Sequence, residues 1–260
     1  MMAAETGISW CDSTFNPWVG CTKVSPACDN CYAEISTPSR TMGIEWGQGK
    51  PRRRTSEENW QTVLKWNRDY EKFLATNKRS RRVFCASLAD VFDNEVHHAW
   101  LVDLFYTIKI TGNLDWLILT KRISVAQKKL PFFDWVDGWD NVWLGISVCN
   151  QAEFDRDVPK LLATPAKIRW LSIEPMLGPI EIPEHLGNRI DWIVVGGESG
   201  HNARPMEKTW VESLINQCRA HNIPFFFKQW GGKGNDKGGC LFDGNELKEF
   251  PIAPPFAPPT

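Results

Sequence analysis

The chain has 260 residues, of which 42% are hydrophobic, and a formal net charge of −1. This length accommodates either one large barrel or two ordinary domains. No run approaches the roughly 20 apolar residues needed to cross a bilayer, and the first residues lack the basic-then-apolar order of a secretory signal. Because the net charge is close to zero, no overall field draws the chain onto nucleic acid. We therefore expect a soluble cytoplasmic protein without membrane contact.

After an irregular opening that extends to about Arg54, short apolar runs alternate with longer amphipathic ones. Near-continuous apolar runs are typical of parallel strands that are buried on both faces. These runs are residues 82–87, 114–120, 142–148, 168–173, 192–196 and 224–228. Helices are predicted over residues 56–76, 95–110, 125–130, 151–162 and 208–220. One more strand, with a weaker pattern, is predicted near residues 15–20.

This alternation of strands and helices predicts an α/β protein. The βα units favour an incomplete TIM-type barrel with parallel strands, formed as a single domain by residues 1–250. The alternative is a doubly wound open sheet. Residues 251–260 are rich in proline, which excludes a helix or a central strand, and are expected to form an extended tail.

Three cysteines stand close together between Gly20 and Tyr32, with the spacing Cys-x6-Cys-x2-Cys. They are Cys21, Cys28 and Cys31. A chain of this size has core enough to fold without disulfides, so clustered thiols indicate a metal site. The Cys-x2-Cys pair lets two thiols face one ion, and turns at Gly20 and Pro26 allow Cys21 to join them.

The number of ligands decides the kind of metal site. A closed zinc site requires four ligands, and Cys11 is the candidate for the fourth. A four-iron cluster held by three cysteines instead leaves one iron open to a substrate or cofactor. We expect the three-cysteine cluster, and the sequence leaves open whether Cys11 is also a ligand.

The residues around these cysteines carry a family resemblance. Three cysteines after a first strand, with Tyr32 beside the last, resemble the cluster loop of radical S-adenosylmethionine (SAM) enzymes. Nearly the whole chain is similar to a phage-encoded, radical-SAM-like family of three-cysteine proteins. The motifs that carry this second resemblance are Trp10-Cys11-Asp12, Thr14-Phe15-Asn16-Pro17-Trp18, Gly20-Cys21 and Cys31-Tyr32-Ala33-Glu34.

Two motifs depart from the superfamily pattern. The first cysteine gap is longer than in the common Cys-x3-Cys-x2-Cys spacing. In addition, Leu88-Ala89-Asp90 stands where Gly-Gly-Glu usually follows the second strand. The resemblance therefore predicts cluster binding more directly than cofactor binding.

The resemblance implies a partial barrel with a [4Fe-4S] cluster on Cys21, Cys28 and Cys31, and SAM bound to the open iron. It implies an enzyme that receives electrons from a reducing donor and generates a 5′-deoxyadenosyl radical. The most specific function that the resemblance implies is that of an isomerase or nucleobase-modifying enzyme, acting on a hypermodified thymine in phage DNA within the host cytoplasm. Tyr32 and Ser147 are assigned to cofactor binding by resemblance.

Polar residues follow the predicted strands, at the end of a barrel where ligand sites gather. Ser87, Asp90, Glu174 and Glu198 are expected to bind the cofactor, and the two glutamates suit its amino group or ribose. Residues expected to bind a nucleotide or DNA substrate are Lys121, Arg122, Lys228, Gln229 and Trp230. The three cations suit carboxylate or phosphate, and Trp230 suits a stacking lid.

Two basic runs, Lys50-Pro51-Arg52-Arg53-Arg54 and Lys78-Arg79-Ser80-Arg81-Arg82, are either solvated surface or phosphate contacts. If the target base lies in duplex DNA, it must be flipped into the barrel mouth while these runs grip the backbone.

Two other functions remain open. A zinc-stabilised nucleic-acid-binding or interaction protein would use Cys11, Cys21, Cys28 and Cys31 as a closed structural site and would have no catalytic activity. A barrel enzyme whose cluster only transfers electrons would bind no SAM. The sequence also leaves open the product, the electron donor, whether SAM is regenerated, and the oligomeric state.

Overall fold

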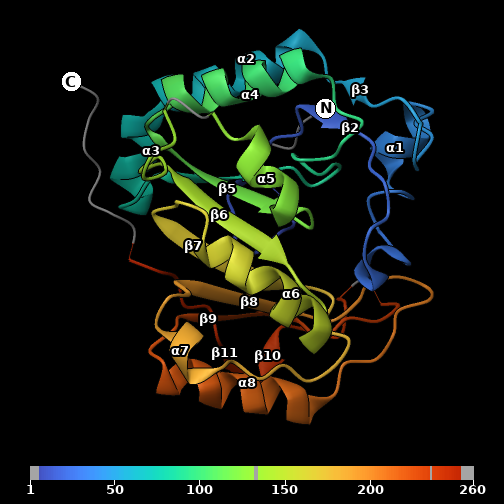
Figure 1. The fold of residues 1–260 in the computed structure, drawn as a ribbon, viewed down its shortest axis with the longest axis vertical. Coiled ribbons are helices and arrows are strands. Elements are labelled where there is room, and N and C mark those ends of the chain that lie inside the picture. Colours follow the sequence, from blue (N-terminus) through green and yellow to red (C-terminus); the bar gives the residue numbers. More distant parts are fainter. Residues whose placement is uncertain (1–5, 132–133, 235, 253–260) are drawn as a thin grey trace.

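The computed structural model describes residues 6–131, 134–234 and 236–252. Its centre is a seven-stranded parallel sheet in the spatial order β1-β4-β5-β6-β7-β8-β9. The sheet curls into a half-barrel, so the predicted α/β partial barrel is confirmed (Figure 1). The strands are β1 (Ser13–Thr14), β4 (Arg81–Cys85), β5 (Leu114–Thr120), β6 (Val142–Ser147), β7 (Ile168–Ile173), β8 (Trp192–Gly196) and β9 (Phe225–Gln229).

The spatial order of the strands follows their order in the chain. A doubly wound sheet reverses its strand order at a switch point, and this sheet has no such reversal among the described strands. The alternative of an open doubly wound sheet is therefore wrong. The carboxyl ends of all seven strands lie at one edge of the half-barrel, as expected for a site at its mouth.

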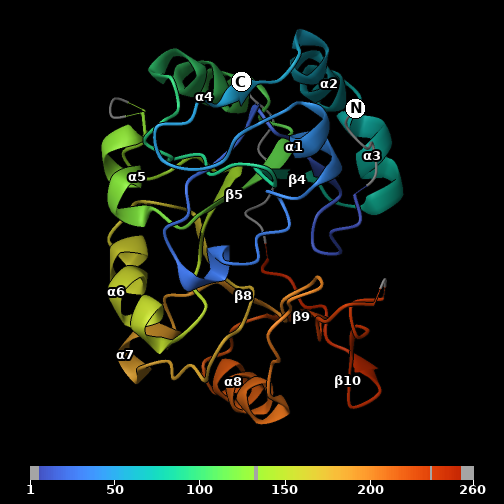
Figure 2. The same ribbon diagram turned by 90° about the vertical axis from the view of Figure 1, so that its right-hand side faces the viewer.

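The principal helices cover the outer face of the sheet (Figure 1, Figure 2). They are α2 (Glu57–Arg68), α3 (Tyr70–Asn77), α4 (His98–Ile110), α5 (Ile123–Lys129), α6 (Gln151–Leu162), α7 (Glu184–Gly187) and α8 (Lys208–Ala220). The smaller elements are β2 (Trp18–Val19), η1 (Pro26–Cys28), α1 (Thr37–Thr41), β3 (Arg53–Arg54), β10 (Leu241–Phe242) and β11 (Asn245–Glu246). No helix in the described ranges is long and apolar enough to cross a membrane.

Two sequence-based elements differ from the structure. The opening barrel strand is Ser13–Thr14 rather than residues 15–20, because Trp18–Val19 pairs antiparallel with Arg53–Arg54 outside the main sheet. The helix predicted over residues 56–76 is divided at Asp69 into α2 and α3. The division follows Asn67, whose side chain accepts a hydrogen bond from the backbone of Asn113, just before β5.

Each face of the sheet has its own apolar cluster. The outer face packs against the helices. The inner face is filled by an aromatic plug, whose residues are Trp10, Phe84, Leu117, Trp143, Ile168, Trp170, Trp192, Val194 and Phe226. The rings of Trp170 and Trp192 lie 5.3 Å apart, and Gly145 leaves the space that the Trp170 indole occupies. Because this plug fills the inside of the curl, the open space is confined to the mouth.

The segment after the β10–β11 hairpin returns to the last strand. The Phe227 amide donates to the Leu247 carbonyl, and the ring of Phe250 packs 5.2 Å from that of Trp192. The guanidinium of Arg82 lies 3.6 Å from the Phe250 ring, which joins this segment to β4. Most of the predicted tail, residues 253–260, lies outside the described residues.

Candidate functional site

A cavity of about 150 Å³ opens at the carboxyl ends of the strands and is lined by Cys21, Cys28 and Cys31 together. A second cavity of about 340 Å³ adjoins it. Six residues line both cavities: Ile8, Cys31, Tyr32, Lys121, Glu174 and Lys228. The structure therefore brings the three clustered cysteines together with polar residues from the ends of β5, β7 and β9.

The cysteines lie on a loop of residues 20–34, here called the cysteine loop. It begins at Gly20, whose φ of 110° is unfavourable for other residues and whose amide donates to the Leu88 carbonyl. Ser25 caps the short helix η1 by accepting from the Ala27 amide at 3.1 Å. Pro26 occupies the first turn of η1. These local features place Cys28 at the end of a tight turn, facing the same cavity as Cys21.

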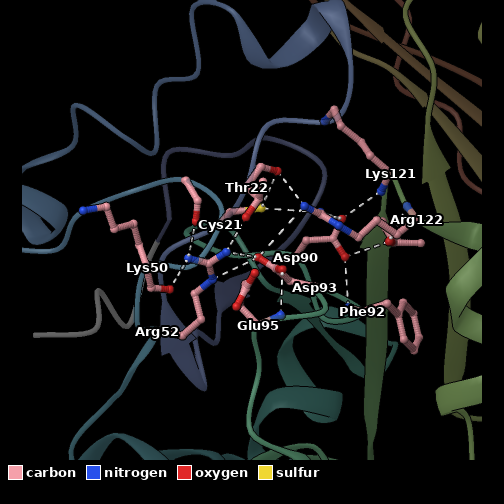
Figure 3. Close-up of polar contacts among 12 residues, drawn as sticks. Cys21, Thr22, Lys50, Arg52, Asp90, Phe92, Asp93, Glu95, Lys121 and Arg122 are labelled. Atoms are coloured by element: carbon pink, nitrogen blue, oxygen red, sulfur yellow. Dashed lines mark hydrogen bonds and ion pairs between the residues drawn. The ribbon is translucent and has the colours of Figure 1, made fainter.

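Arg122 fixes the beginning of the cysteine loop (Figure 3). Its Nη1 lies 3.5 Å from Cys21 Sγ and 3.0 Å from an Asp90 oxygen, and its Nη2 donates to the Thr22 carbonyl. Asp90 also accepts from the Thr120 hydroxyl and from the amides of Phe92 and Lys121. The Asp90 carboxylate, which the sequence assigned to cofactor binding, thus accepts hydrogen bonds from four protein groups. One of these groups is the Arg122 guanidinium, which Asp90 holds in place.

A second arginine reaches the same loop from the opposite side. Arg52 and Asp93 form an ion pair with an Nη2–Oδ2 distance of 2.8 Å, and their side chains are 0% and 1% exposed. Arg52 also donates to the Thr22 hydroxyl, so Thr22 is held by two arginines (Figure 3). Arg52 belongs to the first basic run, and its burial excludes it from contact with a nucleic-acid backbone.

The other arginines of the two basic runs are also engaged within the fold. Arg54 pairs with Asp103 and lies over the Trp60 ring. In the second run, Arg79 pairs with Asp12, Arg81 lies over Phe73, and Arg82 is 8% exposed. Most of these arginines therefore contact other parts of the fold, which supports neither the solvated-surface nor the phosphate-contact alternative for them.

Glu198 and Arg204 hold the far end of the cysteine loop. Arg204 Nη2 donates to Glu198 Oε1 at 2.6 Å and to the Pro26 carbonyl, and Nη1 reaches Asp29 at 3.1 Å. Asn30 donates to Glu198 Oε2 at 2.9 Å. Burial raises the pKa of Glu198, but the hydrogen bonds from Arg204 and Asn30 outweigh it and lower that pKa overall. Glu198 is therefore a charged anchor for the loop.

Tyr32 and Ser87 connect the loop to β4. The Tyr32 hydroxyl donates to the Ser87 carbonyl at 3.1 Å, and the Ser87 hydroxyl accepts from Asn16 Nδ2 at 2.9 Å. Asn16 also accepts from the Leu88 amide. Both sequence-assigned residues line the first cavity, and Asn16 positions Ser87 from beneath it.

Glu174 lies between the two cavities and is paired with Lys228, with 2.7 Å between Oε1 and Nζ. Ser172 donates to its other oxygen, and Ser147 donates to its backbone carbonyl at 3.3 Å. A side chain on Gly196 would place a carbon 2.9 Å from Glu174 Oε1, so the Glu174 carboxylate would have to shift to accommodate it. Three of the sequence-assigned site residues thus form one connected group.

Gln229, the last residue of β9, lies at the site, whereas Trp230, the next residue, does not. Gln229 lines the second cavity and donates to the Ser199 hydroxyl. Trp230 lines neither cavity. Its ring stacks on Phe242 at 5.6 Å, and its Nε1 donates to the Leu241 carbonyl. The β10–β11 hairpin takes up the indole, so the geometry gives no support to the prediction of Trp230 as a stacking lid.

The remaining cysteine of the opening segment lies outside the site. Cys11 packs against the aromatic plug, its Sγ is 3.8 Å from the Ile8 carbonyl, and it does not line the cavity of the other three thiols. Among the described residues, no three His, Cys, Asp or Glu side chains converge closely enough to hold a single metal ion. A closed four-cysteine zinc site is not favoured by this arrangement.

Of the three clustered cysteines, Cys21 has a thiol whose pKa is clearly shifted by its surroundings. Burial, and then the charge of Asp90, raise the pKa of its thiol to about 12, although Arg122 acts in the opposite direction. The thiol is therefore protonated unless a cation binds it. A metal that binds here must displace this proton.

Several residues that position the site were not assigned that role from the sequence. They are Asn16, Asn30, Arg52, Asp93 and Arg204. Asn30 stands between two of the clustered cysteines, so its position was a usable signal. Arg204 had no such signal, because its partners Pro26 and Asp29 lie more than a hundred residues earlier.

Comparison with known proteins gives one family and two similar structures. No curated protein matches the sequence. A cysteine-to-serine variant of spore photoproduct lyase has a TM-score of 0.49 and 9% identity, covering 85% of this chain and 75% of that one. A double variant of that lyase with bound AdoMet and dinucleoside spore photoproduct has a TM-score of 0.43 and 11% identity, covering 80% of this chain and 61% of that one. The family model described as "Protein of unknown function (DUF5131)" matches residues 5–251, and the chain belongs to this family.

Proposed function

We propose that this chain is a radical SAM enzyme whose Cys21, Cys28 and Cys31 hold a [4Fe-4S] cluster. The observation that supports this most strongly is that these three thiols, from one short loop, line the same cavity at the mouth of the half-barrel. Three thiolates suit such a cluster, which leaves one iron for a cofactor. In a four-iron cluster each cysteine binds a different iron, so the thiols need not converge on one point.

The surroundings of the thiols fit this donor set. Arg122 brings a cation to Cys21, which partly offsets the burial and the Asp90 charge that keep its thiol protonated in the absence of a metal. The loop is held at Thr22 by two arginines and at Pro26 and Asp29 by Arg204. Such outer contacts orient metal ligands and change the affinity of the site.

When bound at the open iron, SAM would supply a 5′-deoxyadenosyl radical that removes hydrogen from an unactivated carbon. The protein contributes binding, orientation and exclusion of water. Glu174 and Lys228 form a paired polar wall between the two cavities, with Ser147 behind it. Tyr32 extends this wall from the cysteine loop. The adjoining cavity offers space for a substrate next to the cluster cavity.

More narrowly, we propose a nucleobase adduct as the substrate, such as a hypermodified thymine of phage DNA, and rearrangement or modification of that adduct as the reaction. The sequence resemblance supports this step. Lys121 and Lys228 line the second cavity with Gln229 and supply cationic and amide donors for a nucleotide. A reducing donor supplies the electrons.

The proposal is tested by anaerobic reconstitution with iron and sulfide, followed by measurement of metal content, the visible spectrum and 5′-deoxyadenosine formed from SAM with dithionite. We expect about four irons per chain and dithionite-dependent deoxyadenosine. Cys28→Ala should lose both the iron and the cleavage. Cys240→Ala is the matched control, because Cys240 lies by the β10–β11 hairpin and lines neither cavity.

Cys11→Ala separates the proposal from a zinc site. This variant should keep the iron, because Cys11 does not line the thiol cavity. Stoichiometric zinc in the purified protein, lost on replacing Cys11 and accompanied by no SAM cleavage, would establish the zinc-stabilised binding protein instead.

A further inference from the structure

The second cavity has more positive than negative charge on its walls. Its charged lining residues are Lys121, Glu174, Glu198, Lys228 and Lys237. Glu174 is matched by Lys228 at 2.7 Å, and Glu198 is matched by Arg204 at 2.6 Å. Among the residues that the structure describes, neither the Lys121 ammonium nor that of Lys237 has a carboxylate partner. These two side chains leave two uncompensated positive charges at one cavity.

Lys237 reaches the cavity because a glycine-rich loop folds back over the end of β9. The Gly231 amide donates to the Lys237 carbonyl at 2.7 Å, and the Gly232 amide donates to the Glu198 carbonyl. A side chain on Gly231 would come within 2.4 Å of that same Glu198 carbonyl oxygen. The loop that carries Lys237 is therefore held against the Glu198 segment by backbone contacts that only glycine permits.

The environment of Lys237 is unfavourable for an ammonium without an anion. Lys237 is exposed, but partial loss of water around its ammonium, and next the charge of Lys228, lower its pKa, although the charge of Glu174 acts in the opposite direction. An anionic group bound in the cavity beside Lys237 would offset this repulsion and accept hydrogen bonds from its ammonium.

We propose that the second cavity binds the phosphate of a nucleotide through Lys121 and Lys237, and that the preferred form is a phosphate monoester. Two uncompensated ammonium groups match the two charges of a monoester better than the single charge of a phosphodiester within a strand. This inference rests on the proposed function for its choice of a nucleotide. It narrows the substrate class to a free or terminal nucleotide, in place of a base inside a DNA strand.

Binding is measured by isothermal titration calorimetry on the protein as purified, with thymidine 5′-monophosphate, thymidine and the dinucleotide TpT as probes. The monophosphate should bind most tightly, and increasing salt should weaken its binding more than that of thymidine. Lys237→Gln should weaken monophosphate binding about tenfold, and Lys121→Met by a similar factor. Neither replacement should change thymidine binding.

Lys233→Gln is the matched control, because Lys233 is exposed like Lys237 and belongs to the same glycine-rich loop, but lines neither cavity. Its affinity should match that of the wild type. Equal affinity for the monophosphate and TpT would overturn the monoester preference. Loss of binding in Lys233→Gln equal to that in Lys237→Gln would overturn the assigned site.

These measurements need no cluster, so their failure is distinguishable from failure of the proposed function. A protein that assembles iron and cleaves SAM, but binds no monophosphate, contradicts only the phosphate site. A protein that binds monophosphate through Lys237 but takes up no iron contradicts only the radical enzyme.

Discussion

Arg122 places one guanidinium nitrogen 3.5 Å from the Cys21 sulfur and 3.0 Å from an Asp90 oxygen. Arg122 lies just after β5, and it contacts both the thiol of Cys21 and the Asp90 carboxylate that holds the guanidinium. The loop with the cysteines is held by the barrel as well as by its own turns.

Replacing Arg122 with Met should release the beginning of the cysteine loop and leave Asp90 as a buried carboxylate without its cation. We expect a loss of about 3 kcal/mol in unfolding free energy and faster hydrogen exchange over residues 20–34. Asp90→Asn in the same chain should recover part of the stability but not the slow exchange of the loop. Unchanged exchange in the single variant would show that the turn at Pro26 is sufficient to hold it.

Arg52 is buried and its neighbour Arg53 is exposed. Replacing each in turn therefore distinguishes a structural role from a surface role within this basic run. Arg52→Ala should lower the unfolding free energy by about 3 kcal/mol because its partner Asp93 is 1% exposed. Arg53 is exposed and donates to the Met42 carbonyl, so Arg53→Ala should change stability by less than about 0.5 kcal/mol. Urea denaturation measures both, and equal effects would contradict the buried anchor.

Gly145 determines the packing of the aromatic plug. An alanine there would place its Cβ 2.3 Å from the Trp170 ring, which cannot move without disturbing Trp192. We expect Gly145→Ala to lower the unfolding free energy by about 3 kcal/mol through overpacking. Gly112→Ala is the control, because nothing lies within 4 Å of its added carbon. Thermal unfolding of the two variants should differ clearly.

Asp115 makes stability depend on pH. Burial raises its pKa from 3.8 to about 6, and the opposing charge of Arg82 does not cancel this effect. Between these values the unfolded chain releases the proton while the folded chain keeps it, so stability falls as pH rises from about 4 to 6. Above pH 6 the cost reaches up to about 3 kcal/mol.

Asp115→Asn removes this ionisation. Its stability relative to the wild type should rise between pH 4 and pH 6 and then stay constant. Urea denaturation at pH 4.5, 6 and 7.5 measures the difference, and a difference independent of pH would show that Asp115 titrates normally in the folded chain.

The sheet was largely predictable from sequence because its strands are long apolar runs. The bounds of β5, β7 and β8 agree with the sequence patterns. The opening strand was misplaced because β1 has only two residues, and the aromatic and apolar signal of residues 15–19 belongs partly to a separate pair of strands. Local periodicity does not report which partner a short strand will choose.

The position of a site residue was predictable from the sequence where the residue follows a strand. The role of a residue was less predictable where its contacts within the fold decide that role. Lys121, Ser147, Glu174 and Lys228 line the cavity as strand-end residues should. Asp90 lines the same cavity and Glu198 the adjoining one, but Arg122 and Arg204 occupy their oxygens. The contact of Trp230 with the β10–β11 hairpin could not be predicted, because nothing in the sequence of the hairpin indicates that it packs on this ring.

The contact between Arg204 and Asp29 spans 175 residues of sequence. During synthesis the cysteines emerge early, whereas the arginine that fixes the far end of their loop is translated only after β8. A ribosome-bound fragment that ends before Arg204 carries all three thiols without this support. The order of translation therefore places completion of the cysteine-loop geometry near the end of chain synthesis, after most of the sheet is available to fold.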